Sequence, residues 1–332
     1  MDNVRLGIIG LGGFGGVLAE SAARSGAAEV VSCFARSPDT RAAFGQAHGC
    51  RAAESLDALL GDDEVDAVVL ATPHSTHADL VEQAASAGKH VFVEKPLTLT
   101  VADARRAIAA TDAAGVVLQV GQNRRRQPAN RKIKSMIDAG ALGTLLQLEG
   151  FHTAAGGHKP DLPAWRQDPA ECPFGGMTAL GVHTVDTFHH WVGPARRVVA
   201  FSTKVAGMGR IALDEATTVM IEYDGGVLGS IGTNYFTAPI VTTAAYGSEA
   251  IAWNDEDGKR FFVQARTDAT RSEEDVEQLD TVVDEMSEFA RSIRGEATPE
   301  TGGAEGLEVA AVLEAIGRSV EAGSAVDVDD VR

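Results

Sequence analysis

The stretch VFVEKP at residues 91–96 joins a short apolar run to a carboxylate, an amine and a proline ring. Three consecutive β-branched or aromatic residues without polar alternation are typical of a strand covered on both faces, as in the parallel sheet of an α/β protein. Ligands of such sheets bind beyond the carboxyl ends of the strands, so Lys95 would stand at the edge of a site. A surface lysine followed by a turn proline is the alternative interpretation of these six residues alone.

Strands and helices alternate on both sides of this run. Further strands are predicted at residues 4–9, 29–34, 65–70 and 116–120, with helices at 38–48, 55–60 and 101–114. This alternation predicts a doubly wound parallel Rossmann domain over residues 1–121.

The pattern changes after a predicted helix at residues 129–139. Extended segments then dominate, with a Gly225-Gly226 hairpin signal between two of them, and helices near 279–294 and 304–321 close the chain. We therefore predict an α/β protein whose second domain, residues 122–332, is α+β, is built on a mainly antiparallel sheet, and serves substrate binding and oligomerisation. The extended segments expected in it are residues 144–152, 197–204, 216–223, 227–235, 240–246 and 260–265.

Length and charge limit the classes of function. A chain of 332 residues exceeds the size of a single compact core, so two domains are expected. The balance of 47 acidic against 29 basic residues, net −18, would repel phosphate backbones and anionic lipid. We therefore expect neither a nucleic-acid nor a membrane partner, and interpret the three arginines at 124–126 as a domain crossover.

The cysteines and the start of the chain indicate the compartment. Cys33, Cys50 and Cys172 are odd in number and lack metal-binding or C-x-x-C spacing, which fits a reducing compartment and no structural metal. A strand-like segment begins at Val4 without a basic leader, and no apolar run approaches membrane-spanning length. The protein is expected to be cytoplasmic.

A glycine-rich turn follows the first strand. Gly10, Gly12 and Gly15 form the pattern G-x-G-x-x-G between a strand and a helix, with Gly13 and Phe14 inside the turn. This context allows a tight turn, close backbone approach to a pyrophosphate, and helix N–H groups directed at the anion. We predict a dinucleotide site here, although a glycine-rich turn occurs in other strand–helix units as well.

The end of the second strand bears on the choice of coenzyme. An acidic residue there would bind the ribose hydroxyls of NAD, but this sequence has Ala35, Arg36 and Ser37. A guanidinium and a hydroxyl without a nearby carboxylate suit a 2′-phosphate, so NADP is preferred and NAD remains possible. Alternatively, Arg36 is solvated and stacks on the adenine.

Two further segments carry histidines. Thr72, Pro73, His74 and His77 follow the strand at 65–70, and a cofactor-lining turn explains them better than a metal site does. The segment at 175–191 reads as one helix with apolar Met177, Leu180, Phe188 and Trp191 on a core-facing stripe. His183, Asp186 and His190 lie on another face of this helix, where they could form part of an active site. The alternatives are a structural histidine at a helix–sheet contact and a metal triad.

These residues together resemble the glucose-fructose oxidoreductase/inositol dehydrogenase (Gfo/Idh/MocA) family. The resemblance covers residues 4 to 192 in order and spacing, whereas the last third of the chain adds only a compatible strand pattern. It is carried by the Gly10–Gly15 turn, Ala71-Thr72-Pro73 with His77, Glu94-Lys95-Pro96, Asn123-Arg124-Arg125, Trp165-Arg166, and the Gly175-Gly176 helix with His183 and Asp186.

The resemblance implies hydride transfer between a nicotinamide and a secondary alcohol or ketone of a sugar, cyclitol or related polyol. It implies that Lys95 orients the reacting oxygen beside the cofactor, that His183 donates or accepts the proton, and that Asp186 and Arg124 contact the substrate. A cis peptide bond between Lys95 and Pro96 is also implied. The remaining residues that it places at the cofactor are Thr72, His74, Glu94, Asn123, Trp165 and Arg166.

One position departs from the family pattern. Four residues before the catalytic histidine the family commonly has an aspartate, and this sequence has Ala179. Either the substrate is oriented differently or another group takes over, and His152, at the end of its strand, is the candidate. Relatives of this fold also include cofactor-binding regulators and NAD-dependent glycoside hydrolases, which are the alternative functions.

Oligomeric state is inferred from the second domain. An antiparallel sheet commonly leaves one face free, and an apolar free face is normally buried against another subunit. A homodimer or homotetramer is therefore expected.

Overall fold

The computed structural model describes residues 3–205 and 211–332, and the chain divides into two compact units. Unit 1 comprises Met1–Gln122 and Asp280–Leu307, and unit 2 comprises Asn123–Leu279 and Glu308–Arg332. The first junction lies one residue from the predicted boundary. The prediction differs from the structure for Asp280–Leu307, which it placed in the second domain and which packs with the first.

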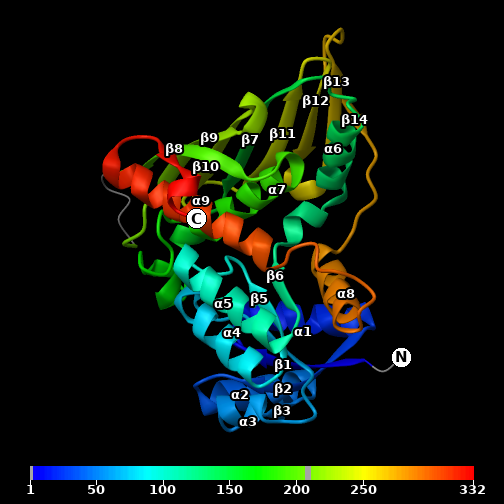
Figure 1. The fold of residues 1–332 in the computed structure, drawn as a ribbon, viewed down its shortest axis with the longest axis vertical. Coiled ribbons are helices and arrows are strands. Elements are labelled where there is room, and N and C mark those ends of the chain that lie inside the picture. The colour runs from blue at the N-terminus through cyan, green and yellow to red at the C-terminus, as the bar shows by residue number, and fades with distance from the viewer. Residues whose placement is uncertain (1–2, 206–210) are drawn as a thin grey trace. The chain divides into compact units, whose positions relative to one another are not determined.

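Unit 1 is a six-stranded parallel sheet with helices on its faces (Figure 1). The strand order β3-β2-β1-β4-β5-β6 is that of the doubly wound fold, so the predicted Rossmann domain is confirmed. Its elements are β1 (Val4–Ile9), α1 (Gly13–Ser25), β2 (Ala28–Phe34), α2 (Pro38–His48), β3 (Arg51–Ala52), α3 (Leu56–Leu60), β4 (Ala67–Leu70), η1 (His74–Thr76), α4 (His77–Ser86), β5 (His90–Glu94), α5 (Val101–Ala114), β6 (Leu118–Gly121) and α8 (Thr281–Ile293).

Apolar burial explains why α8 returns to unit 1. Leu18 of α1 is fully buried, and Met286 and Phe289 of α8 join the same core cluster. The Phe289 ring meets the Phe92 ring of β5 edge to face, with 5.7 Å between centroids. Such a buried aromatic pair contributes packing energy beyond its area, and it fixes α8 to the sheet.

Unit 2 is built on a nine-stranded sheet of order β14-β13-β12-β11-β7-β10-β9-β8-β15. Only β7 and β10 pair in parallel among its recorded strand pairs, so the predicted mainly antiparallel sheet is confirmed. Its strands are β7 (Leu145–Thr153), β8 (Ala195–Thr203), β9 (Ala216–Tyr223), β10 (Leu228–Asn234), β11 (Ile240–Gly247), β12 (Ala250–Asp255), β13 (Arg260–Ala265), β14 (Ser272–Glu274) and β15 (Val326–Asp327).

The helical segments of unit 2 include α6 (Pro128–Asp138), α7 (Val182–Val192) and short turns. These turns are η2 (Asn123–Arg126), η3 (Gly156–His158), η4 (Ala164–Gln167), η5 (Met177–Gly181), η6 (Asp224–Gly226), η7 (Glu256–Gly258) and η8 (Val328–Asp330). Helix α9 (Gly303–Ala322) begins in unit 1 and ends in unit 2. Among the described residues, no helix has both the length and the apolar character that a membrane span requires.

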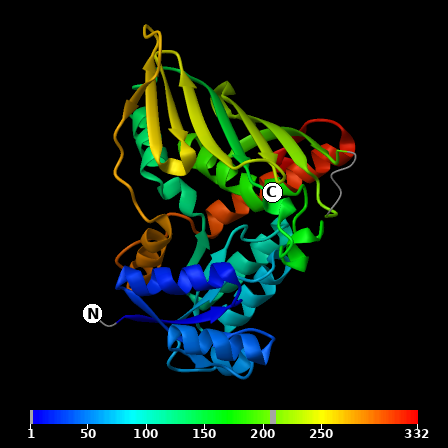
Figure 2. The same ribbon diagram turned by 180° about the vertical axis from the view of Figure 1, so that it is seen from behind.

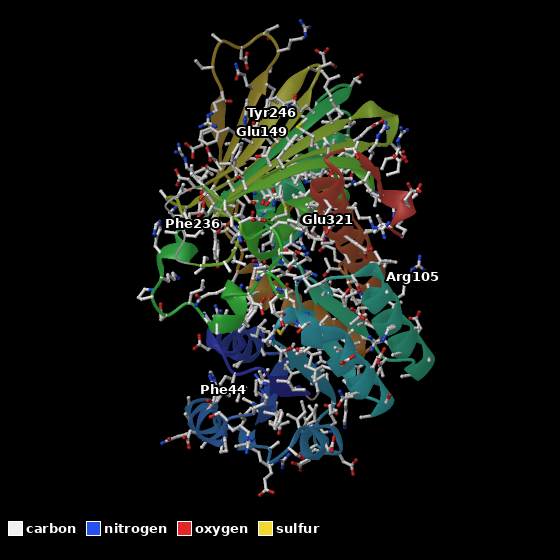
Figure 3. The ribbon with its side chains drawn as sticks, turned by 90° about the vertical axis from the view of Figure 1, so that its left-hand side faces the viewer. Phe44, Arg105, Glu149, Phe236, Tyr246 and Glu321 are labelled. Atoms are coloured by element: carbon white, nitrogen blue, oxygen red, sulfur yellow. The ribbon has the colours of Figure 1, made fainter. Side chains whose placement is uncertain are left out.

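The two faces of the large sheet differ. Helix α7 packs directly on β7 at Gly150, where an added Cβ would lie 2.3 Å from Thr184 Cγ2. The opposite face exposes apolar side chains, and in Figure 2 its strands are seen without a covering helix. Cross-strand register aligns Phe201, Thr218, Gly232 and Phe151 on that face. Glu149 and Tyr246 also lie side by side there, joined by a 3.1 Å hydrogen bond (Figure 3).

Two local predictions differ from the structure. The predicted single helix at 175–191 begins with the five-residue π turn η5, so Leu180 leaves the buried stripe that Met177, Phe188 and Trp191 form. Strand β12 was not predicted because its alternation is carried by Ala250 and Ala252, which have weak β propensity. The Gly225-Gly226 hairpin is confirmed, and both glycines have positive φ (75° and 85°).

Candidate active site

Three of the predicted motifs lie at one edge of the unit 1 sheet. Strands β1, β4 and β5 are adjacent and parallel, so their carboxyl ends share an edge. The turn that begins at Gly10 follows β1, residues 71–73 follow β4, and Lys95-Pro96 follows β5. The structure thus brings together residues that are separated by more than eighty positions in the sequence.

Steric constraints explain the glycines of the first turn. Gly10 has φ of +96°, and a Cβ there would lie 2.4 Å from the carbonyl oxygen of Ala71. A Cβ at Gly15 would lie 2.2 Å from the carbonyl oxygen of Gly10. Gly12, which precedes α1, has open space at its Cβ position. An anion can therefore approach the backbone N–H groups of the first turn of α1, which begins at Gly13. These residues fit a dinucleotide pyrophosphate, and Phe14 in the turn is 42% exposed.

The end of β2 presents the residues predicted to select the coenzyme. The Ser37 hydroxyl caps α2 by accepting a hydrogen bond from the Thr40 N–H at 3.3 Å. Arg36 is exposed and Ala35 is half-buried. A negatively charged group near Arg36 would also lie at the N-terminus of α2, which favours anions.

Arg41 is a further residue of this region, and it was not predicted from the sequence. Its Nη1 donates to the carbonyl oxygen of Ala35 at 2.8 Å, and its guanidinium lies 5.5 Å from the centroid of the Phe34 ring. The contact holds a second cation at the end of β2. In the sequence, Arg41 could have been noticed only as a second arginine five positions after Arg36, in the first turn of a predicted helix.

The backbone around Lys95 is held in place by several contacts. The Lys95-Pro96 bond is cis, as the resemblance implied. Glu94 is 9% exposed, and its Oε2 accepts from the Lys95 N–H at 3.3 Å. His77 is fully buried, with Nδ1 2.9 Å from the Pro96 carbonyl oxygen and Nε2 3.1 Å from that of Thr72.

These contacts give His77 a structural role in addition to its predicted place near the cofactor. It links the turn after β4 to the turn after β5. His74 is 4% exposed and packs its ring edge to face against His77, with centroids 5.8 Å apart. In residues 3–205 and 211–332, no cluster of three His, Cys, Asp or Glu side chains is suited to hold a metal ion.

In unit 2, the η5 turn leads into α7 and positions His183. A π turn inside a helix is frequent at functional sites because it reorients the residues that follow. His183 is 8% exposed, and its ring stacks on that of His152 with centroids 6.1 Å apart and an interplanar angle of 29°. The structure therefore brings together two histidines that lie thirty-one positions apart in the sequence.

Asp186, predicted to bind substrate, forms a buried ion pair. Its two carboxylate oxygens accept from Arg125, from Nε at 2.8 Å and from Nη2 at 2.5 Å. The two side chains are 1% and 5% exposed. A bidentate pair of this kind is strong and directional, and it fixes α7 to the η2 turn. This geometry favours a structural role for Asp186.

Arg124 also has a partner within unit 2. Its guanidinium forms an ion pair with Asp257, whose carboxylate accepts a hydrogen bond from Gln127 Nε2 at 2.7 Å. Burial lowers the pKa of Arg124 to about 10, so it stays charged at neutral pH. Arg124 and Arg125 of η2 thus hold two different elements, η7 and α7, and Asn123 stands at the start of the same turn.

The η4 turn presents Trp165 and Arg166, which were predicted to contact the cofactor. The Arg166 guanidinium stacks on the Trp165 ring at 4.4 Å. Burial raises the pKa of Tyr235, and Arg166 opposes that rise. Stacking immobilises the guanidinium, which prepares it to bind an anionic group.

The Arg125–Asp186 pair gives a prediction about stability. Asp186→Ala removes a buried counter-charge of the Arg125 guanidinium, and we expect it to lower the free energy of unfolding by about 3 to 5 kcal/mol. Urea unfolding followed by circular dichroism measures the change. As a control, Asp66→Ala removes the partner of Arg5 in a pair that is 37% and 34% exposed, and should cost much less. Equal losses in the two variants would contradict the role given to burial.

Comparison with known proteins agrees with this arrangement. Residues 4–122 match the family model described as oxidoreductase family, NAD-binding Rossmann fold, and residues 130–252 match the GFO/IDH/MocA C-terminal domain. A 1,5-anhydro-D-fructose reductase of Ensifer adhaerens is 27% identical over 98% of each chain. The NAD⁺-dependent scyllo-inositol 2-dehydrogenase of Bacillus subtilis (strain 168) is 35% identical over 52% of this chain and 49% of its own.

A solved structure matches both units. The WlbA dehydrogenase of Bordetella pertussis, in complex with NADH and UDP-GlcNAcA, is 26% identical, covers 98% of this chain and 97% of its own, and has a TM-score of 0.87. Sequence and fold therefore agree over nearly the whole length. The family predicted from the sequence is confirmed: the chain belongs to the GFO/IDH/MocA family of oxidoreductases.

Proposed function

We propose that this protein transfers hydride between NAD(P) and a secondary alcohol or ketone of a sugar, cyclitol or related polyol. The observation that carries the proposal is the shared edge of β1, β4 and β5, where the dinucleotide turn follows β1 and Lys95 follows β5, with β4 between them. The relatives are named as reductases and dehydrogenases of an anhydrosugar and an inositol, which supports this substrate class. When bound, the nicotinamide accepts or supplies the hydride.

The residues of the chain supply the proton chemistry. A carbinol carbon releases hydride only as its hydroxyl proton is removed, and an imidazole titrating near neutrality suits that transfer. His183 has this role in the proposal. The Lys95 ammonium stabilises the negative charge that develops on the substrate oxygen and orients that oxygen. Arg124 and Asp186 support the site through their ion pairs, while Asn123, Trp165 and Arg166 bind the cofactor side.

The preferred coenzyme in this proposal is NADP. Arg36, Ser37 and Arg41 place two guanidinium groups and a hydroxyl near the end of β2. Ala35 stands where an acidic residue would repel a 2′-phosphate. NAD has the same pyrophosphate and nicotinamide, so we expect it to be used less efficiently.

A substrate panel tests the proposal. The protein is incubated with sugars, cyclitols and glycosides while the absorbance of reduced nicotinamide is followed. Net formation or loss of reduced coenzyme supports the proposal. Release of a free aglycone without net reduction would indicate a glycoside hydrolase, and neither signal with tightly bound coenzyme would indicate a regulator.

We further propose that the exposed sheet face of unit 2 is buried between two copies of the chain. Exposed apolar residues stand on several adjacent strands of this face, and exposed apolar patches are typical of subunit contacts. Phe201 is 73% exposed and Phe151 is 46% exposed. The other large apolar residues exposed on this face are Met220 (41%), Leu228 (47%) and Ile240 (51%).

This surface gives a prediction about mass in solution. Light scattering at micromolar concentration should give a dimer or tetramer, and the double variant Phe151→Asp/Phe201→Asp should lower the mass because it places charges in an apolar contact. Leu279→Asp, at an apolar residue 41% exposed outside the sheet, is the matched control and should leave the mass unchanged. A monomeric wild-type protein would contradict the proposal.

A further inference from the structure

The position of the missing family aspartate is closed by packing. Ala179 is 5% exposed and belongs to a buried cluster of apolar and aromatic residues. A carboxylate at this position would be desolvated among apolar side chains, which is costly without a partner. The other buried members of the cluster are Leu162, Cys172, Leu213, Tyr235 and Phe236.

The next carboxylate along the helix is committed elsewhere. Asp186 follows His183 by three residues, and both of its oxygens accept from Arg125 at 2.8 Å and 2.5 Å. The pair is at most 5% exposed. The His183 ring is also held by an element of unit 2 outside α7.

Strand β7 supplies that element. Gly150 allows α7 to approach until an added Cβ would meet Thr184 Cγ2 at 2.3 Å and Phe188 Cζ at 3.3 Å. His152, two residues further on, points to the same face of the strand because side chains alternate along β7. It is 4% exposed, and its ring reaches His183 at 6.1 Å between centroids.

Neighbouring strands flank His152 on both sides. His152 pairs with Thr233 of β10 on one side and with Val241 of β11 on the other. A Cβ added at Gly181, two residues before His183, would lie 2.8 Å from Thr233 Cγ2, so the helix and the sheet are in close contact there as well. His152 therefore lies in an interior where side chains interdigitate closely.

We propose that His152 is a positioning residue for His183: its ring stacks on the His183 ring and holds it in the orientation that proton transfer requires. In this sequence the stacked ring replaces the carboxylate that the family pattern has at position 179. The inference rests on the proposed function, because it assigns His152 a role in the same reaction. It differs from the role predicted from the sequence, in which His152 contacts the substrate.

The test compares two substitutions that separate ring packing from polar contact. His152→Ala removes the ring and should lower kcat about tenfold to a hundredfold with KM changed less than threefold, because a misoriented acid–base group affects the chemical step. His152→Phe keeps a flat ring and should recover most of kcat. If His152→Phe is as impaired as His152→Ala, or if KM rises while kcat is unchanged, His152 contacts the substrate and the proposal is wrong.

Nuclear magnetic resonance gives a readout that does not depend on activity. In histidine-labelled protein, the carbon-bound ring protons of His183 should be displaced by the ring current of residue 152, to a similar extent in the wild type and in His152→Phe, and should relax toward ordinary values in His152→Ala. Unchanged His183 resonances in His152→Ala would overturn the proposal. His48→Ala is the matched control, because the His48 ring also packs on an aromatic ring, that of Phe44 at 4.2 Å, but on α2 of unit 1.

The two measurements separate this inference from the proposed function. If the wild-type protein oxidises or reduces no member of the substrate panel, the proposed function fails even when the His183 resonances behave as predicted. If turnover is observed but the resonances and kcat do not respond to His152→Ala, the proposed function stands and the positioning role fails.

Discussion

Replacing Lys95 by alanine is expected to reduce turnover by about two to four orders of magnitude while leaving coenzyme binding nearly intact. The substitution removes only the Lys95 side chain, which follows β5. The Gly10–Gly15 turn, which fits the pyrophosphate, follows β1 and is unchanged. The loss arises because the oxygen of the substrate develops negative charge during hydride transfer, and the ammonium group stabilises that charge more in the transition state than in the ground state.

Steady-state kinetics measures the loss, and fluorescence titration with reduced coenzyme measures binding. Lys134→Ala is the matched control, since Lys134 pairs with Asp138 on the surface of α6 and is outside the proposed site. Turnover of Lys95→Ala within about threefold of the wild type, with KM unchanged, would show that the role assigned to Lys95 is wrong.

Replacing Ala35 by aspartate should reverse the coenzyme preference from NADP to NAD. The wild-type protein is expected to prefer NADP by roughly tenfold to a hundredfold in kcat/KM, because a charge-assisted pair with a phosphate is worth on the order of 1.5 to 3 kcal/mol. Ala35→Asp introduces a carboxylate that accepts hydrogen bonds from the ribose hydroxyls of NAD and repels a 2′-phosphate. Arg36→Ala should remove most of the preference without reversing it.

The structure adds Arg41 to this prediction. Its guanidinium is anchored to the carbonyl oxygen of Ala35 at 2.8 Å, so Arg36→Ala/Arg41→Ala should remove more of the NADP preference than either single change. Kinetics with both coenzymes under identical conditions measures the ratio. Arg105→Ala, at an exposed arginine of α5 in the same unit, is the control and should leave the ratio unchanged. A wild-type protein that uses NAD as well as NADP, or better, would mean that Arg36 is solvated or stacks on the adenine.

Local sequence signals predicted the parts of the fold that depend on short segments. Strand β4 and residues 91–93 of β5 are uninterrupted apolar runs, and Gly15 is required by a contact within its own turn. Helix α8 was also predicted, but its place in unit 1 was not, because that place depends on packing between Phe289 and Phe92, which are far apart in the sequence. The hydrophobic pattern of a helix does not specify which sheet it covers.

The same distinction applies to the candidate site. Lys95 and His183 were found because each stands in a recognisable local pattern. The partners of Asp186 and His152 were not found, because Arg125 is 61 positions from Asp186 and the stacking of His152 depends on how α7 approaches Gly150. Arg41 was missed for another reason: an arginine in the first turn of a surface helix is ordinary, and only its hydrogen bond to Ala35 distinguishes it.

In the proposed oxidation, hydride passes from the substrate carbon to the nicotinamide and remains there. The most direct measurement uses a substrate found in the panel, deuterated at the reacting carbinol carbon, with oxidised coenzyme, and analyses the reduced coenzyme by mass spectrometry. We predict one deuterium in the reduced coenzyme for each substrate molecule oxidised. Product formation without deuterium in the coenzyme, or with release of a free aglycone and no net reduction, would contradict the claim.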